Sequence, residues 1–174
     1  NRHELRKKFS WQDDTAVCLL MGGGEGLLPM KEILGEVIAK IIVKMRFVAI
    51  TGRNKELADE LKHLYPDVEV YGFTEAIPEL MHAADIIISK AGGLTAAETL
   101  TTSLNYIIYK PLPGQEEANA EYLKNAGAAI IAKTPSDVLL FLENYSTAQA
   151  KQRQALGRPE AAPDIAKAVI NMLS

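Results

Sequence analysis

The chain has 174 residues, 48% of them hydrophobic and 24% charged, a composition typical of one globular domain with a single sizeable core. The formal net charge of −3 gives no overall attraction for nucleic acid, and no apolar run approaches the roughly 18 residues that cross a bilayer. The single cysteine, Cys18, lies in an apolar run, so we expect a buried thiol without a disulfide in a reducing, cytoplasmic compartment.

Short apolar runs alternate with amphipathic stretches along the chain. The runs that predict strands lie at residues 15–21, 46–51, 68–72, 84–89, 105–110 and 128–132. The stretches that predict helices lie at residues 30–44, 54–65, 75–83, 95–103, 116–126 and 135–145, and the tail predicts two more, broken at "GRPEAAP". Strands that are apolar throughout are covered on both faces. The sequence therefore predicts an α/β fold: a Rossmann-like, doubly wound parallel sheet of about six strands.

The first predicted strand runs into "MGGGEGLLPM", where four glycines precede a helix that Pro29 can start. Ligands of open parallel sheets bind beyond the carboxyl ends of the strands, and glycines let the backbone approach a ligand with its amides exposed. The spacing is not GxGxxG, and no acidic residue after the second strand stands out as a ribose anchor, so NAD is disfavoured. A tight turn is the alternative, but a turn needs fewer glycines.

The fourth predicted strand runs into "SKAGGLTAAE", residues 89–98. Gly92 and Gly93 end the loop, and Thr95 is expected to cap a helix whose positive end and free amides would bind an anion such as a diphosphate. Glu98 has two interpretations. It completes a T-x-x-E capping box with Thr95, or it accepts hydrogen bonds from the vicinal hydroxyls of a ribose.

Two further strand ends carry polar or aromatic residues. In "YKPLPGQEEANAEYL", a rigid turn places Gln115, Glu116 and Asn119 on the first turns of a helix, where amides and carboxylates together can bind several sugar hydroxyls. The alternative is an acid-rich helix N-terminus that the dipole favours. In "YGFTEAIPELM", the backbone near Phe73 could pair with a base edge, or Phe73 belongs to the core.

Taken in order, "LLMGGGEGLLP", "AITGRNKEL", "VYGFTEAIPELMHAADIIISKAGGLTAAE" and "PLPGQEEANAEYL" resemble the C-terminal domain of the glycosyltransferases that make monogalactosyl- and glucosyl-diacylglycerol. This group, of the glycosyltransferase family 28 type, is related to the peptidoglycan N-acetylglucosaminyltransferase. The resemblance spans nearly the whole chain and implies the GT-B architecture, in which two Rossmann-like domains face each other. Residues 1–174 would be the single domain that binds the UDP-sugar. The chain begins without methionine, and we expect an upstream acceptor domain in a longer protein.

The resemblance also implies a role for each of the residues at the strand ends. It assigns Phe73 to the uracil pocket, Gly92, Gly93, Leu94 and Thr95 to the diphosphate, Glu98 to the ribose, Gln115 and Glu116 to the hexose with Asn119 behind them, and Gly23 and Gly24 to the phosphate or sugar from the other side. Arg53, in "TGRN", would help to neutralise the leaving diphosphate; its alternative is a solvated loop charge.

The implied reaction is the transfer of glucose or galactose from UDP to diacylglycerol or a related lipid, with inversion, in a single displacement. Helix dipole and amides would stabilise the leaving diphosphate without a bound metal or another cofactor. The catalytic base is expected in the missing N-terminal domain, so this chain alone should bind the donor and be inactive. The alternatives are a non-catalytic nucleotide-binding module and a UDP-sugar epimerase of related architecture.

The N-terminal run combines basic and aromatic residues, which can bind a membrane surface. Four basic residues precede or flank two aromatic ones: Arg2, Arg6, Lys7 and Lys8, with Phe9 and Trp11. They could touch anionic lipid, although a solvated helix face is favoured. We expect the full-length protein to be cytoplasmic and peripheral at the cytoplasmic face of the membrane.

Two stretches depart from the family pattern. The predicted helix 30–44 leaves about two residues before the next strand, where relatives have a longer connection. "TLTTSLNYIIY" has no glycine or proline before its strand.

Overall fold

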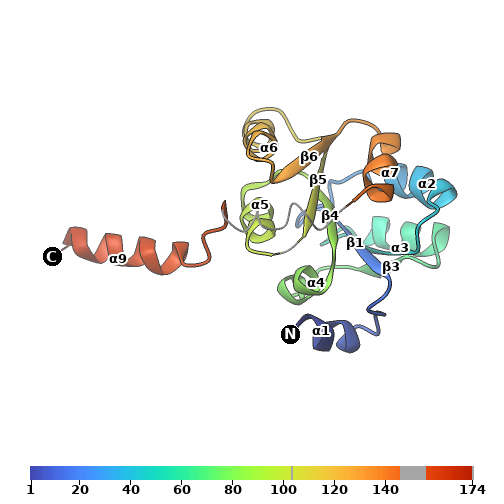
Figure 1. Ribbon diagram of the computed structural model, residues 1–174, viewed down its shortest axis with the longest axis horizontal. Coiled ribbons are helices and arrows are strands. Elements are labelled where there is room, and N and C mark those ends of the chain that lie inside the picture. Colours follow the sequence, from blue (N-terminus) through green and yellow to red (C-terminus); the bar gives the residue numbers. More distant parts are fainter. Residues whose placement is uncertain (103, 146–155, 174) are drawn as a thin grey trace.

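A computed structural model describes residues 1–102, 104–145 and 156–173. Six strands form one sheet in the order β3-β2-β1-β4-β5-β6, and every pairing is parallel (Figure 1). The strands are β1 (Ala16–Met21), β2 (Met45–Ile50), β3 (Glu69–Tyr71), β4 (Ile86–Ser89), β5 (Asn105–Tyr109) and β6 (Ala129–Ala132). The doubly wound α/β fold predicted from the sequence is confirmed.

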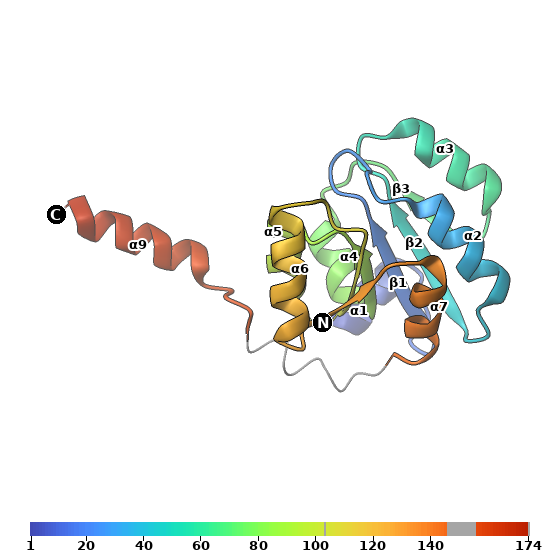
Figure 2. The ribbon, with the colours of Figure 1, turned by 90° about the horizontal axis from the view of Figure 1, so that it is seen from above.

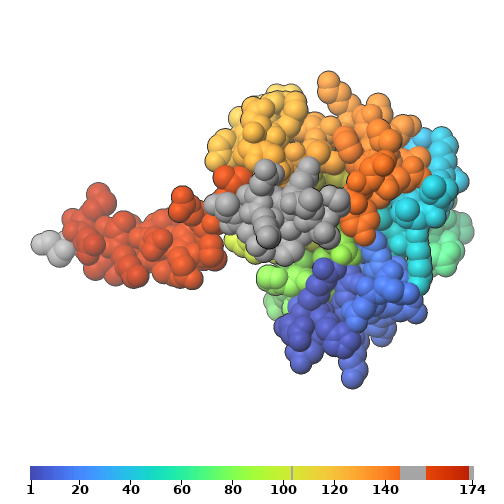
Figure 3. Space-filling model, in the orientation of Figure 1, coloured from blue at the N-terminus to red at the C-terminus, as the bar shows by residue number. Residues whose placement is uncertain are grey.

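Helices cover both faces of the sheet, as Figure 2 shows. One face carries α1 (Arg2–Lys8), α4 (Ile77–Ala83), α5 (Gly93–Leu100) and α6 (Gln115–Asn125). The other carries α2 (Met30–Lys40), α3 (Lys55–Leu64) and α7 (Pro135–Glu143). The last helix, α9 (Ala161–Leu173), projects away from the sheet (Figures 2 and 3). The first of the two predicted tail helices falls largely on residues 146–155, outside the described residues.

Two apolar clusters form the core, one on each face of the sheet, and the central strands contribute side chains to both. Leu19 packs in the cluster that includes residues of α4, α5 and α6, whereas Cys18 and Leu20 pack in the one that includes residues of α2, α3 and α7. Side chains of a strand alternate between faces, so a strand buried on both sides is apolar at every position. Cys18 is fully buried as expected, and this burial raises the pKa of its thiol.

The helix predicted over residues 30–44 ends at Lys40, so that boundary is wrong. Ile41 is already extended, with φ −65° and ψ 130°, and residues 41–44 form a connection longer than the predicted two residues. The sheet sets this boundary, because Met45 must return to the amino end of β1 to pair with Ala16. The apolar period of the sequence continues past the helix end, but Ile42 lies in solvent.

The N-terminal run, residues 1–11, packs against the domain through two buried side chains, those of Arg6 and Trp11. Arg6 is 3% exposed, and its guanidinium donates to the carbonyls of Ala83 (2.9 Å) and Thr15 (3.2 Å) and pairs with Asp85 at 2.5 Å. Trp11 is buried as well. Arg6 and Trp11, two of the residues that could have touched lipid, are therefore buried in the domain. Within the described ranges, no helix combines the length and the apolar character that crossing a bilayer requires.

Candidate functional site

The carboxyl ends of three strands meet at the middle of the sheet. Met21 at the end of β1 is in register with Ile50 of β2 on one side and with Ser89 of β4 on the other. The strand order runs outward in opposite directions from β1 and β4, which makes this pair the topological switch point, where ligands of open α/β sheets bind. The glycine loop after β1 and the loop after β4 flank this point.

The glycines after β1 fall into two kinds. A side chain at Gly22 or Gly26 would collide with backbone, since a Cβ there would lie 2.7 Å from Gly26 and 2.5 Å from the Thr51 carbonyl oxygen, respectively. Gly23 has open space around it and φ +72°, while a Cβ at Gly24 would meet nothing nearer than an Arg53 nitrogen at 4.0 Å. The turn thus accounts for Gly22 and Gly26, and space is left beside Gly23 and Gly24.

Helix α5 begins two residues earlier than expected. Gly92 is its N-cap, extended at φ −63° and ψ 140°, and Thr95 is the third residue of the helix. The expectation that Thr95 caps the helix is therefore wrong, and so is the capping-box interpretation of Glu98, because Gly92 occupies the N-cap and Thr95 lies inside the helix. The amides of Gly93, Leu94 and Thr95 come before the first intrahelical bond, which Ala96 donates to the Gly92 carbonyl at 2.9 Å.

Glu98 lies exposed on the same helix. Among the described residues its side chain takes part in no hydrogen bond or ion pair, and the Thr101 hydroxyl bonds to its backbone carbonyl.

The loop before α5 is anchored from below by a tyrosine that the sequence interpretation missed. The Tyr106 hydroxyl donates to the Lys90 carbonyl at 2.8 Å, and the Ser89 hydroxyl lies 2.8 Å from the same oxygen. Burial raises the pKa of Tyr106 to about 12, so the phenol stays protonated as a donor. The available signal was a phenol in an otherwise apolar strand, since a buried hydroxyl needs a partner.

Helix α6 brings the third group of predicted residues to the start of α5. A Cβ at Gly92 would lie 3.9 Å from Glu116 Oε1, and one at Gly93 would lie 3.8 Å from Gln115 Nε2. The other Glu116 oxygen, Oε2, accepts from the Leu112 amide at 2.7 Å. Residues separated by more than twenty positions thus line one site, with exposed amides, a carboxylate oxygen and a side-chain amide.

Arg53 and Phe73 form a second group, at the ends of β2 and β3. The Arg53 guanidinium carbon lies 5.4 Å from the Phe73 ring centroid, and Nη1 lies 3.1 Å from Glu25 Oε1. Phe73 is 68% exposed, so the alternative that places it in the core is wrong. Arg53 is exposed, as a loop charge would be, yet it has two partners. The pairing of Arg53 with Glu25 was not predicted, because Glu25 lies within the glycine run and 28 positions from Arg53 in the sequence.

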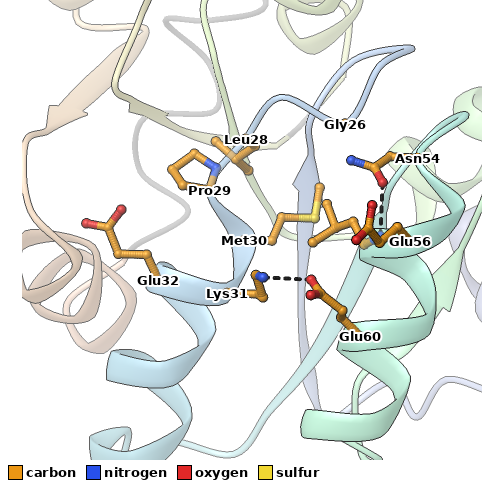
Figure 4. Close-up of a pocket in the computed structure, with 10 residues that line it drawn as sticks. Gly26, Leu28, Pro29, Met30, Lys31, Glu32, Asn54, Glu56 and Glu60 are labelled. Atoms are coloured by element: carbon orange, nitrogen blue, oxygen red, sulfur yellow. Dashed lines mark hydrogen bonds and ion pairs between the residues drawn. The ribbon is translucent and has the colours of Figure 1, made fainter.

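A hollow of about 500 Å³ lies between the first turns of α2 and α3 (Figure 4). Glu56 and Glu60 line it, and Lys31 pairs with Glu60 at 2.6 Å, which raises the pKa of Lys31. The predicted site residues do not line this hollow. Its carboxylates would repel a diphosphate, so we place the candidate site at the switch point. In the described part of the chain, no three His, Cys, Asp or Glu side chains gather as a metal site.

Comparisons with known proteins identify the family of the chain. The sequence model of one family, the Glycosyltransferase family 28 C-terminal domain, matches residues 17–167. The chain is 35% identical to monogalactosyldiacylglycerol synthase 2, chloroplastic, of Arabidopsis thaliana, over 95% of this chain and 39% of that protein. It is 31% identical to the processive diacylglycerol beta-glucosyltransferase of Bacillus licheniformis, over 88% of this chain and 40% of that protein.

Solved structures share the fold. The crystal structure of MurG from Acinetobacter baumannii superimposes with a TM-score of 0.77 at 22% identity, over 98% of this chain and 53% of that one. WaaG, a glycosyltransferase involved in lipopolysaccharide biosynthesis, superimposes with a TM-score of 0.67 at 16% identity, over 88% of this chain and 45% of that one. The predicted half of a GT-B architecture is confirmed. The chain spans about two fifths of the length of the curated relatives it matches.

Proposed function

The chain belongs to the glycosyltransferase family 28 C-terminal domain family, and on this premise we propose that it is the UDP-sugar-binding domain of a hexosyltransferase. The full-length protein would transfer glucose or galactose to diacylglycerol or a related lipid, as the names of its relatives indicate for them. One observation carries the proposal: the open amides at the start of α5 lie beside Gln115 and Glu116 at the switch point of the sheet.

The donor would lie across this point with its diphosphate at α5. The amides of Gly93, Leu94 and Thr95 donate to the phosphate oxygens, and the positive end of the helix dipole favours their charge. Glu98 accepts from the ribose hydroxyls. Gln115 and Glu116 hold the hexose, and Asn119 supports them from behind.

The other side of the donor would face the ends of β1, β2 and β3. Gly23 and Gly24 let the backbone approach the phosphate or the hexose, because the space beside them is open. The backbone near Phe73 binds the uracil. The Arg53 guanidinium pairs with Glu25 in this structure, so it would leave Glu25 in order to contact the diphosphate.

The chemistry that this arrangement favours is a single displacement at the anomeric carbon, with inversion. Negative charge would grow on the leaving diphosphate, where the α5 amides and the helix dipole would stabilise it, joined by Arg53 once it leaves Glu25. We propose that these groups replace a bound metal. The base that deprotonates the acceptor would come from an upstream acceptor domain, so the chain by itself would bind the donor without turnover.

The names of the relatives support a diacylglycerol acceptor, and such an acceptor bears on where the protein works. Diacylglycerol resides in the bilayer, so a protein that glycosylates it must reach the membrane surface. We propose that the full-length protein works as a peripheral protein at the cytoplasmic face of the membrane and that its acceptor domain supplies the lipid site. The burial of Arg6 and Trp11 leaves the N-terminal run, residues 1–11, with a reduced part in this contact.

The test is calorimetric titration of the chain with UDP, UDP-glucose, UDP-galactose and NAD in the presence of EDTA. We expect saturable binding of UDP and of one UDP-hexose, none of NAD, and no effect of chelation. Absence of UDP binding would contradict the donor-site proposal, and binding lost in EDTA would contradict its metal-independent part. Incubation of a UDP-hexose with the full-length protein and diacylglycerol separates glycolipid synthesis from epimerisation and from mere nucleotide binding.

A further inference from the structure

Lys110, at the end of β5, has an unusual backbone conformation. Its φ is +47°, and in the part of the chain that the structure describes, Ser10 is the one other non-glycine residue with positive φ. The left-handed region is unfavourable for a residue with a Cβ, and Pro111 disfavours helical conformations in the residue before it. Such a conformation persists where surrounding contacts determine it, and these positions concentrate at functional sites.

The contacts that hold Lys110 come from the first turn of α2. Its ammonium lies 2.9 and 2.8 Å from the two carboxylate oxygens of Glu32 and 5.2 Å from the Tyr109 ring centroid. The Tyr109 hydroxyl donates to Glu32 Oε1 at 3.0 Å. Glu32 lies at the edge of the hollow between α2 and α3, and its side chain points away from Lys31 and Glu60 (Figure 4). One carboxylate therefore holds the last two residues at the end of β5.

Both partners keep their charges at neutral pH. Hydrogen bonding from Lys110, together with that from Tyr109, lowers the pKa of Glu32. Bonding to Glu32 raises the pKa of Lys110.

A short, stiff loop joins this pair to the candidate hexose site. Four residues, two of them proline, separate Lys110 from Gln115, the first residue of α6. The far end of the loop is fixed as well, because Leu112 donates its amide to Glu116 and Gly114 donates to Glu117 at 3.3 Å. Since prolines restrict φ, a change in direction at Lys110 is carried to Gln115 and Glu116.

We propose that Glu32 and Lys110 are positioning residues that set Gln115 and Glu116 against the hexose of the donor. This inference rests on the proposed function. The pair contacts α2, β5 and the loop before α6, whereas the diphosphate and the nucleoside are assigned to α5 and to the ends of β1, β2 and β3. Loss of the pair should therefore weaken recognition of the hexose and leave recognition of UDP intact.

The experiment titrates the chain and its variants with UDP, UDP-glucose and UDP-galactose. In Glu32→Gln and in Lys110→Met, we expect the ratio of the UDP-hexose Kd to the UDP Kd to rise about fivefold, with the UDP Kd unchanged within about twofold. The double variant should be no worse than either single variant, because both remove one interaction. The matched control is Lys40→Met, which breaks the Glu36–Lys40 pair on the same helix, and its ratio should not change.

A second variant separates positioning from stability. Glycine adopts the Lys110 backbone conformation without strain, so Lys110→Gly should remain folded and still lose hexose recognition. A Kd ratio that stays at the wild-type value in these folded variants would overturn the inference while UDP binding upholds the proposed function. Wild-type protein that binds no UDP would overturn both.

Discussion

The side-chain amide of Asn119 donates to the Ala91 carbonyl at 2.9 Å and so fastens α6 to the loop that precedes α5. Ala91 is completely buried. This bond joins the helix that carries Gln115 and Glu116 to the loop that carries Gly92 and Gly93. Asn119 therefore supports the start of α6 against this loop, and its place behind residues that hold the hexose stays a prediction.

Replacing Asn119 by leucine should destabilise the fold and disturb the site together. The buried Ala91 carbonyl would lose its donor, which costs about 1 to 3 kcal/mol of unfolding free energy. Urea denaturation measures this loss, and titration with a UDP-hexose should show weaker binding. Glu121→Gln, on the exposed side of the same helix, is the control and should change neither quantity. Unchanged stability in Asn119→Leu would show that solvent replaces the bond.

Replacing Glu98 by glutamine should weaken UDP binding with little effect on folding. The carboxylate caps no helix, so the unfolding free energy should stay within about 0.5 kcal/mol of the wild-type value. If Glu98 binds the ribose hydroxyls, UDP affinity should fall about tenfold, whereas 2′-deoxy-UDP, which already lacks one hydroxyl, should lose less. Equal losses for both nucleotides would argue against a ribose contact.

The Arg53 and Glu25 pair predicts opposite effects for two neutralising substitutions. If Arg53 contacts the diphosphate, Arg53→Met should weaken UDP binding about fivefold, whereas Glu25→Gln releases Arg53 and should strengthen it by about twofold. Both effects should shrink as salt is added, because the pair is exposed. Uridine, which carries no phosphate, is the control ligand. Identical responses with uridine and UDP would exclude a diphosphate role for Arg53.

Arg6 should be a determinant of stability. Replacing it by methionine would leave Asp85 without its most buried partner and deprive the carbonyls of Ala83 and Thr15 of their donor. Breaking a buried pair in this way costs about 3 kcal/mol. Lys7→Met removes the same charge from the exposed side of α1 and should cost less than about 0.5 kcal/mol. Chemical denaturation compares the two, and equal effects would mean that the burial of Arg6 is unimportant.

Asp137 should contribute to the pH dependence of stability. Hydrogen bonds from the amides of Thr134 and Lys133, both 2.9 Å, lower the pKa of its carboxyl in the folded state. A lowered folded pKa gives stability that is present above the unfolded value of about 3.9 and is lost as pH falls through the folded value.

Asp137→Asn should therefore lower the urea midpoint near about pH 7, and the difference from wild type should vanish near about pH 2. The Glu121→Gln variant serves again as control, with the same midpoint as wild type at both pH values. A difference that persists undiminished in acid would mean that the capping bonds do not depend on ionisation.

The local pattern of the sequence determined the fold class and the places where function was to be sought. Apolar runs alternating with amphipathic ones could form only a covered parallel sheet, and such a sheet gathers its loops at the carboxyl ends of the strands. The residues at which helices begin were predicted less well from the sequence. Thr95 has the chemistry of a cap, but Gly92 takes that place because the chain leaving β4 is extended there and becomes helical from Gly93.

Only the tertiary structure decided which residues meet. The bond from Asn119 to Ala91, the burial of Arg6 beside Asp85, the turn of the chain at Lys110 and the partners of Arg53 all join positions that are distant in sequence or depend on such a partner. Hydrophobic period and residue type act over a few neighbouring positions, whereas these contacts depend on the register of the whole sheet. The sequence by itself therefore determined the scaffold and the chemical types at its loops, and the packing of helices on the sheet decided how those groups are placed.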